Sequence, residues 1–379
     1  MPQTDDASLH HEVNPLRGRI MQTLLLILFI PASVGMFYFW LTFSGVNANP
    51  LVPFAGMLNG TTIRPPVTRV LTPWLTNGLA LLFPPSIHER AEGLLTGSGL
   101  LPDLLREYRV PSGFALEGAI NMAIQLICIL GFALALKALI EAVFKLPRMI
   151  PELLTIVGLL GLSPMMFFAY IYDLPNLFLC TLLLYCIATR KKVAYFTVFI
   201  LAILNKETSA VLAVPSVLLF WDFQKPIISK ILKGTGTLIG LALVIRISLA
   251  FAYRGNPGGV FEFHLPDSLE MLRDYPVLGI GSILAGAGMI WLVFSDWKHK
   301  PAVAVLGALP GLLLLVLWFI GSVAFEFREF YEVYAASFLC ILATVVKWRF
   351  PLESRVPSMQ QIIESLPLLT RKPIKSTAD

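Results

Sequence analysis

A polar tetrapeptide, Asn205-Lys206-Glu207-Thr208, interrupts an otherwise apolar segment that runs from Val193 to Trp221. A lysine can bind an anion, a glutamate can accept a proton, and the asparagine and threonine add hydrogen-bonding groups. Ionisable side chains at membrane depth are costly unless they are paired or hydrated, so they are functional candidates. Lys206 and Glu207 are neighbours in sequence and point to different faces of a helix, so we expect each to have its own partner.

A second candidate is Asp173, which stands between two apolar runs that otherwise lack charge. A carboxylate there can serve as a general base or hold a metal ion. The sequence Asp173-Leu174-Pro175 is also a typical helix start, in which the aspartate caps the helix. The two roles are compatible, and Glu207 is the other candidate base.

Arginines form a third group of candidates. The planar guanidinium group matches phosphate and carboxylate groups with two parallel hydrogen bonds. Arg64 and Arg69 flank Pro65-Pro66 just before an apolar stretch, where they are placed to bind a phosphate or to anchor the chain at the lipid headgroups. Arg246 lies inside the apolar run 232–253, and its expected partner is Glu207, Asp173 or a bound anion.

The segment from Glu326 to Glu332 contains three carboxylates and one arginine between two apolar runs. Arg328 and Glu332 are spaced i, i+4, which predicts a local surface pair. In the alternative interpretation, the three carboxylates and the arginine line the mouth of a site: Glu326, Arg328, Glu329 and Glu332.

Composition shows what must position these residues. The chain is 56% hydrophobic and 14% charged, and its mean hydropathy is +0.74. Soluble domains contain about 25% charged residues, so the chain is predicted to be an integral membrane protein. The alternating pattern of a membrane β-barrel is absent, which indicates an all-α transmembrane helix bundle.

The apolar runs define about eight spans plus a re-entrant helical hairpin. Each span needs about 20 apolar residues. The runs are residues 20–43, 115–137, 150–171, 174–189, 193–222, 232–253, 276–295, 301–323 and 333–347. Most of the 29 basic residues lie in the connections that one topology places in the cytoplasm, with both termini there.

That topology requires the run 193–222 to enter and leave on the same side. The run has basic residues beyond both ends and the tetrapeptide in its middle, which favours two short helices with the tetrapeptide at the tip. One long tilted helix is the alternative, and it would break the charge pattern downstream.

We expect one membrane domain, residues 1–350, and a short basic cytoplasmic tail, residues 351–379. The first extracytoplasmic loop, residues 44–114, is long. Within it Val67 to Phe83 is predicted to dip into the membrane rather than cross it, and Leu101 to Arg109 is amphipathic and is expected to lie flat on the membrane surface.

Three short elements, Arg69-Val70-Leu71-Thr72-Pro73, Tyr172-Asp173 and Asn205-Lys206-Glu207-Thr208, together with the long outer loop, resemble the GT-C class of polytopic glycosyltransferases. The resemblance implies a sugar donor linked to polyprenyl phosphate, an active site that faces outward, and a location in the bacterial inner membrane. Many enzymes of this class have a catalytic acid early in the first outer loop, whereas residues 44–88 contain no Asp or Glu.

On this hypothesis Asp173 or Glu207 acts as base, and a second group of residues binds substrate and its phosphate: Arg64, Arg69, Lys206, Arg246 and Arg328. The supporting residues are Asn205, Thr208, Glu326 and Glu329. No cofactor is required, although a divalent metal is compatible with the chemistry. The expected partners are a polyprenyl-phosphate-linked sugar and a glycan or protein acceptor, with no nucleic acid.

A transporter or flippase of an anionic or lipid-linked substrate is the alternative, and a non-catalytic envelope-assembly protein is a further one.

Overall fold

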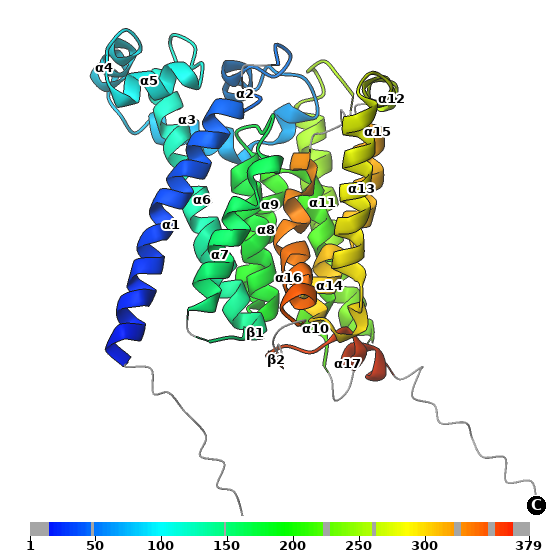
Figure 1. The fold of residues 1–379 in the computed structure, drawn as a ribbon. Coiled ribbons are helices and arrows are strands. Elements are labelled where there is room, and N and C mark those ends of the chain that lie inside the picture. Colours follow the sequence, from blue (N-terminus) through cyan, green and yellow to red (C-terminus); the bar gives the residue numbers. More distant parts are fainter. Residues whose placement is uncertain are drawn as a thin grey trace, which may run out of the picture.

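The computed structural model describes residues 15–46, 49–147, 149–222, 228–259, 263–321, 327–347 and 353–366. These residues are mostly helical, with a single pair of two-residue strands among them, which confirms the predicted all-α class (Figure 1). The longer helices are α1 (Pro15–Phe43), α6 (Ala115–Val143), α7 (Ile150–Leu160), α8 (Asp173–Ala188), α9 (Lys192–Asn205), α11 (Ile228–Ala252), α13 (Pro276–Phe294), α15 (Gly311–Gly321) and α16 (Tyr331–Lys347).

Five segments of the described chain are long and apolar enough to cross a membrane, and this confirms the prediction of a membrane protein. They are residues 23–43, 115–143, 228–252, 302–321 and 327–347. A bent pair, Leu265–Asp274 with Gly279–Phe294, makes a sixth if its 113° bend lies within one span.

One expected span is shorter than predicted. In place of the run 150–171, α7 has 11 residues, whereas α8 has 16 residues and closely matches the run 174–189. After α7 the chain leaves the helix at Gly161, and Pro164 then stands in a short 3-10 helix, Ser163–Met165. At 1.5 Å per residue α8 is about 24 Å long.

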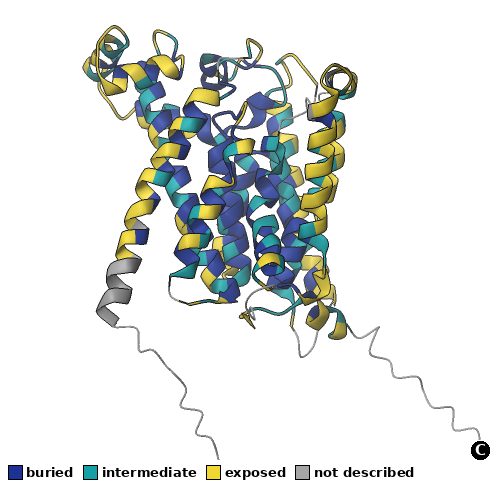
Figure 2. Cartoon of the chain, viewed as in Figure 1, coloured by how far each residue is buried: buried dark blue, intermediate teal, exposed yellow. Residues whose placement is uncertain are grey.

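The core of the bundle is built from α6, α8 and α16, with α14 (Ala302–Ala308) packed against α16 and α8. Buried side chains line these helices on several sides, among them Phe132 and Leu136 on α6 and Leu177 on α8. In Figure 2 the outer helices α1 and α13 are mostly exposed. Their exposed residues are apolar, for example Ile27 and Ile283, as expected of helices that face lipid.

The two ends of the bundle differ in structure. At one end lie α2 (Phe54–Asn59), α3 (Leu71–Ala80), α4 (Pro85–Leu95), α5 (Leu100–Glu107) and α12 (Leu265–Asp274), and we call this the loop end (Figure 1). At the other end lie the start of α1, the strands β1 (Phe144–Lys145) and β2 (Glu353–Ser354), and α17 (Met359–Glu364). Basic residues that include Lys145, Arg190 and Lys191 lie beside these elements, and we call this the basic end.

The segment 193–222 turns back on itself. Helix α9 is followed by the 3-10 helix η3 (Glu207–Ala213) and by α10 (Val217–Phe220). The Tyr195 hydroxyl donates to the Leu212 carbonyl at 2.6 Å, and the Lys192 Nζ lies 5.5 Å from the centre of the Phe220 ring. Both ends of the segment therefore lie at the basic end, as the predicted hairpin requires.

The turn of this hairpin begins at Lys206. Its backbone is extended, with φ −155° and ψ 133°, and this ends α9 after Asn205. Residues 207–213 then form a 3-10 helix instead of continuing the α-helix. The tetrapeptide therefore stands at the tip, because its backbone leaves the α-helical conformation there.

The outer loop contains short helices. Residues 67–83 form the end of the 3-10 helix η1 (Pro66–Thr68) and the 10-residue helix α3. A helix of that length spans about 15 Å, half of a bilayer core of about 30 Å, so it cannot cross. The amphipathic helix α5 buries Leu105 and exposes Leu100.

Residues 353–366 of the predicted tail pack against the bundle. Strand β2 pairs antiparallel with β1, the Ala302 N–H donates to the Pro357 carbonyl at 2.8 Å, and the Trp221 indole N–H donates to the Ser365 hydroxyl at 3.1 Å. The tail thus joins α6, α14 and the returning arm of the hairpin.

Candidate functional site

The three short elements singled out in the sequence meet at the tip of the hairpin. The Val70 N–H donates to the Leu204 carbonyl at 2.9 Å, which joins the start of α3 to the end of α9. The Thr72 hydroxyl donates to the Asn205 side-chain oxygen at 2.9 Å, and the Asn205 amide donates to the Tyr172 carbonyl at 2.7 Å. Asn205 therefore holds three segments together that are far apart in the sequence.

Eight charged residues gather around this junction, and we call them the charged cluster. They are Arg69, Asp173, Lys206, Glu207, Arg246, Arg328, Glu329 and Glu332. The cluster contains four cations and four carboxylates, so the charges buried there have partners of the opposite sign. This balance is what a low-dielectric environment requires.

Glu207 is bound by two arginines. Arg69 donates to both carboxylate oxygens, from Nη2 at 2.6 Å and from Nε at 3.1 Å. Arg246 Nη2 lies 3.5 Å from Oε2 of the same carboxylate, which confirms the expected partner of Arg246. The Arg69 guanidinium also stacks over the Tyr172 ring at 4.4 Å.

Arg69 remains charged in this position. Burial alone would lower the pKa of Arg69, but the neighbouring Glu207 carboxylate raises it well above its usual value. The loop arginine is therefore a permanent cation at the hairpin tip.

Lys206 has partners different from those of Glu207, as predicted from their adjacency. Its Nζ lies 3.1 Å from Glu329, 3.4 Å from Glu332 and 3.6 Å from Asp173. The side chains of Lys206, Asp173 and Glu332 are 0% exposed. A single ammonium group is thus enclosed by three carboxylates.

The predicted surface pair between Arg328 and Glu332 is wrong. Arg328 Nη1 lies 3.4 Å from Asp173 and 3.5 Å from Glu329, and its guanidinium stacks over the Tyr170 ring at 4.7 Å. Glu332 instead accepts hydrogen bonds from Asn176, at 2.9 Å, and from Thr208. Both side chains are turned into the bundle because buried partners are available on α8 and at the hairpin tip.

Asp173 begins α8, as the helix-start pattern predicts, but it does not cap the helix. The residue at the cap position is Tyr172, and it has no side-chain hydrogen bond to the helix. The Asp173 carboxylate accepts from the Tyr170 N–H at 2.7 Å and pairs with Arg328 and Lys206. It therefore ties the turn before α8 to the charged cluster.

Two predicted site residues are not placed in the cluster. Arg64 donates from Nη2 to the Gly258 carbonyl at 2.6 Å, and its own N–H donates to the Pro257 carbonyl at 2.8 Å. Arg64 and Arg69 thus do not act together on one anion, because the intervening 3-10 turn directs them to different partners. Glu326 lies outside the described residues.

Sequence reasoning did not single out two polar residues that support the cluster. Asn176 donates to Glu332, and the Ser209 hydroxyl donates to the Asn176 side-chain oxygen at 2.6 Å. Asn176 lies three residues after Asp173 on α8, so the spacing of two polar side chains in an apolar helix was the available signal.

One edge of the cluster is partly exposed. The Glu207 side chain is 28% exposed, Arg246 is 20% exposed and Glu329 is 16% exposed. Glu207 and Glu329 are therefore the carboxylates that an incoming molecule can touch, whereas Asp173 and Glu332 lie behind them.

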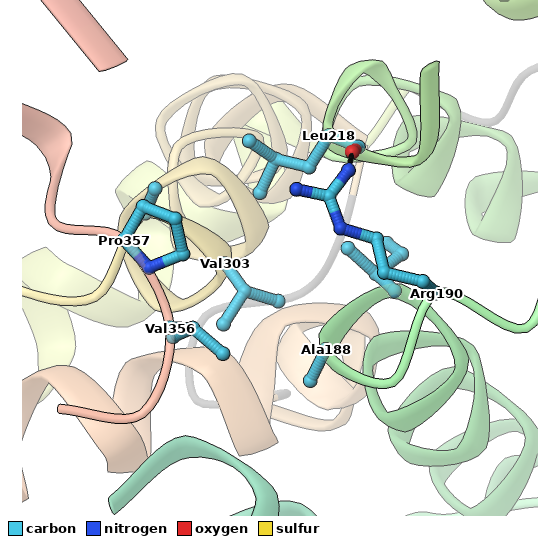
Figure 3. Close-up of a pocket in the computed structure, with 8 residues that line it drawn as sticks. Ala188, Arg190, Leu218, Val303, Val356 and Pro357 are labelled. Carbon is cyan, nitrogen blue, oxygen red and sulfur yellow. Dashed lines mark hydrogen bonds between the residues drawn. The ribbon is translucent and has the colours of Figure 1, made fainter. Parts of the chain in front are cut away.

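Two small cavities lie outside the cluster. One, at the basic end, has a volume of about 30 Å³ and is lined by α8, α10, α14 and the tail, where Arg190 donates to the Leu218 carbonyl (Figure 3). The other, of about 20 Å³, lies at the loop end between Met57, Trp74 and Tyr253. Each has room for about one water molecule and is far below the roughly 300 Å³ of a ligand pocket.

Within the described ranges, no group of three or more His, Cys, Asp and Glu residues has the geometry of a metal site. The four cysteines are buried and unpaired with one another, on α6, α8 and α16. Comparison with protein-family models, curated proteins and solved structures gives no match. The function has to be argued from the geometry of the charged cluster.

Proposed function

We propose that the protein is a membrane glycosyltransferase of the GT-C type, which transfers a sugar from a polyprenyl-phosphate donor to an acceptor on the extracytoplasmic side. The observation that supports this is the meeting of the three elements that carry the resemblance. Arg69 contacts both the Glu207 carboxylate and the Tyr172 ring, and Lys206 contacts Asp173. The charged cluster brings eight ionisable side chains together at this junction.

The proposed membrane arrangement has about eight spans and a re-entrant hairpin in a bacterial inner membrane. The basic end faces the cytoplasm with both termini, and the loop end faces outward, because lysine and arginine accumulate on the cytoplasmic side. Helix α9 has 14 residues between the basic end and the tip, a rise of about 21 Å. In a core of about 30 Å the charged cluster then lies in the outer third, within reach of a lipid headgroup.

In the proposed reaction, an acceptor hydroxyl oxygen attacks the anomeric carbon of the donor sugar. The bond from that carbon to the phosphate oxygen breaks, and its electron pair stays on the phosphate. Arg69 and Arg246 stabilise the negative charge that develops there. The hydroxyl proton passes to a carboxylate, so the displacement needs no covalent enzyme intermediate.

Exposure and position decide which carboxylate takes the proton. In an inverting displacement the acceptor hydroxyl approaches opposite the leaving phosphate, and Glu207 is bound to Arg69 and Arg246 on the side of the phosphate. Glu329 is 16% exposed and pairs with Lys206, whereas Asp173 is fully buried. We therefore assign the base to Glu329 and make Asp173 a positioning residue that acts through Lys206 and Arg328.

The test is turnover of purified protein with a set of polyprenyl-phosphate sugars. We expect Glu329→Gln to lower turnover by about 10²-fold to 10⁴-fold, the usual contribution of a general base. Asp173→Asn should also lower it, because it removes a partner of Lys206 and Arg328, while Glu353→Gln, at the basic end, serves as the matched control and should not.

Turnover that survives both Glu329→Gln and Asp173→Asn would remove the assignment. A wild type that turns over no donor but moves a lipid-linked or anionic substrate across vesicles would replace it with the transporter, since a broken segment with a charged tip also occurs in transport proteins. Absence of both activities would favour a non-catalytic role in envelope assembly.

A further inference from the structure

The contacts of Glu207 are those of a bound anion. Arg69 approaches both carboxylate oxygens with its fork, and Arg246 approaches one of them from α11. Arg246 is itself fixed by hydrogen bonds to the Thr68 carbonyl at 3.1 Å and to the Thr68 hydroxyl at 2.5 Å. Two convergent guanidinium groups are a common way to bind phosphate.

The charges in the cluster are unevenly divided. Arg69 and Arg246 face a single carboxylate, Glu207, so this half has one positive charge in excess. Lys206 and Arg328 face three carboxylates, so the other half has one negative charge in excess. An anion with two negative charges would suit the first half better than one carboxylate does.

The positive half is also the accessible half. Glu207 and Arg246 have the largest exposed fractions among the paired side chains of the cluster, 28% and 20%. Glu207 stands at the first position of η3, directly after the extended backbone of Lys206. Its side chain can therefore move outward without unfolding α9.

We propose that Arg69 and Arg246 form a phosphate site, and that Glu207 occupies this site as an internal competitor until a phosphate-bearing ligand displaces it. The inference rests on the proposed function in taking the phosphate of a polyprenyl lipid as the natural ligand. It explains why a carboxylate stands there: without it, the nearly buried Arg69 would lack a countercharge in the ligand-free protein.

The test is equilibrium binding to purified wild type in detergent with three probes: farnesyl phosphate, inorganic phosphate and farnesol. We expect farnesyl phosphate to bind and farnesol to bind at least ten-fold more weakly. Binding of inorganic phosphate as well would identify a free anion as a ligand of the same site. Equal binding of farnesol and farnesyl phosphate would overturn the proposal, because the isoprenyl chain alone would then account for affinity.

Variants distinguish whether Glu207 competes with the ligand or helps to bind it. Glu207→Gln should bind farnesyl phosphate about ten-fold more tightly than wild type, Arg246→Met at least ten-fold more weakly, and Glu353→Gln equally. Glu207→Asp keeps the charge on a shorter side chain and should give an intermediate gain, which keeps the test available if Glu207→Gln does not fold. Weaker binding by both Glu207 variants would overturn the proposal.

These outcomes are distinct from those of the sugar-transfer assay. Tighter binding by Glu207→Gln in a protein that transfers no sugar would leave the phosphate site standing and remove the glycosyltransferase. If the protein transfers sugar but its Glu207 variants bind farnesyl phosphate more weakly, the glycosyltransferase assignment stands and the proposal that Glu207 competes for the phosphate site is removed.

Discussion

At the scale of single residues, the structure separates two neighbours into two environments. Glu207 meets arginines at the accessible edge, whereas Lys206 is enclosed by carboxylates behind it. The extended backbone of Lys206 produces this division, because it turns the two side chains apart. Each residue can then be tested without removing the partners of the other.

Replacing Lys206 with methionine should destabilise the protein strongly. The substitution leaves three carboxylates around an apolar side chain, and loss of one partner of a buried ion pair costs about 3–5 kcal/mol. Thermal unfolding in detergent measures the effect, with Lys233→Met on the exposed face of α11 as the control.

Adding Glu332→Gln to Lys206→Met should recover part of the lost stability, since it removes one of the carboxylates left without a cation. Unfolding temperatures that are equal for Lys206→Met and Lys233→Met would show that the lysine has no such role.

At the scale of elements, one amide side chain positions the hairpin. Asn205 accepts from Thr72 on α3 and donates to the Tyr172 carbonyl before α8. The backbone bond between Val70 and Leu204 adds a second link to the outer loop. The outer loop thus supports the charged cluster, because it places Arg69 and Thr72 at the hairpin tip.

We expect Asn205→Leu to lower the free energy of unfolding by about 1–3 kcal/mol, because the buried Thr72 hydroxyl loses its acceptor. The Tyr172 carbonyl loses the Asn205 amide but keeps the hydrogen bond from the Asn176 N–H at 3.0 Å. Thr197→Val on the exposed face of α9 is the matched control, because the Thr197 hydroxyl bonds only locally, to the Val193 carbonyl. An unchanged stability of Asn205→Leu, measured by thermal unfolding, would show that the hairpin tip is held by other contacts.

At the scale of the whole molecule, the two ends of the bundle have different structural roles. The loop end holds the charged cluster, and the basic end is closed by the tail, which contacts α6, α14 and the returning arm of the hairpin. The tail therefore fixes the base of the hairpin whose tip forms the cluster.

Removing residues 353–379 should lower the unfolding temperature, because strand β2 and helix α17 are lost. The deleted contacts include the bond from the Arg355 N–H to the Val143 carbonyl at 2.8 Å and the bond from the Met359 N–H to the Lys300 carbonyl at 3.0 Å. A chain ending at residue 366 is the control. Equal unfolding temperatures for the two truncated chains would contradict a structural role of the tail.

Much of this arrangement follows from the sequence, since hydropathy and basic residues locate the long helices and the fold-back. The convergence of Arg69, Asp173 and Glu207 on one place could be anticipated from the cost of burying charge. The partners of Arg328 and Glu332 could not be anticipated, because an i, i+4 spacing carries no information on buried groups that are distant in the sequence. The separation of Arg64 from Arg69 could not be anticipated for a similar reason, since the turn at Pro65-Pro66 decides where each arginine points.

The central claim is that residues 193–222 form a hairpin whose two ends lie on the same side of the membrane. Sided labelling with an impermeant maleimide tests it most directly, using single cysteines introduced as Lys191→Cys, Asp222→Cys and Ser98→Cys in a chain whose four native cysteines are buried. The account predicts that positions 191 and 222 react from the same face and position 98 from the opposite face. Labelling of positions 191 and 222 from opposite faces would contradict it.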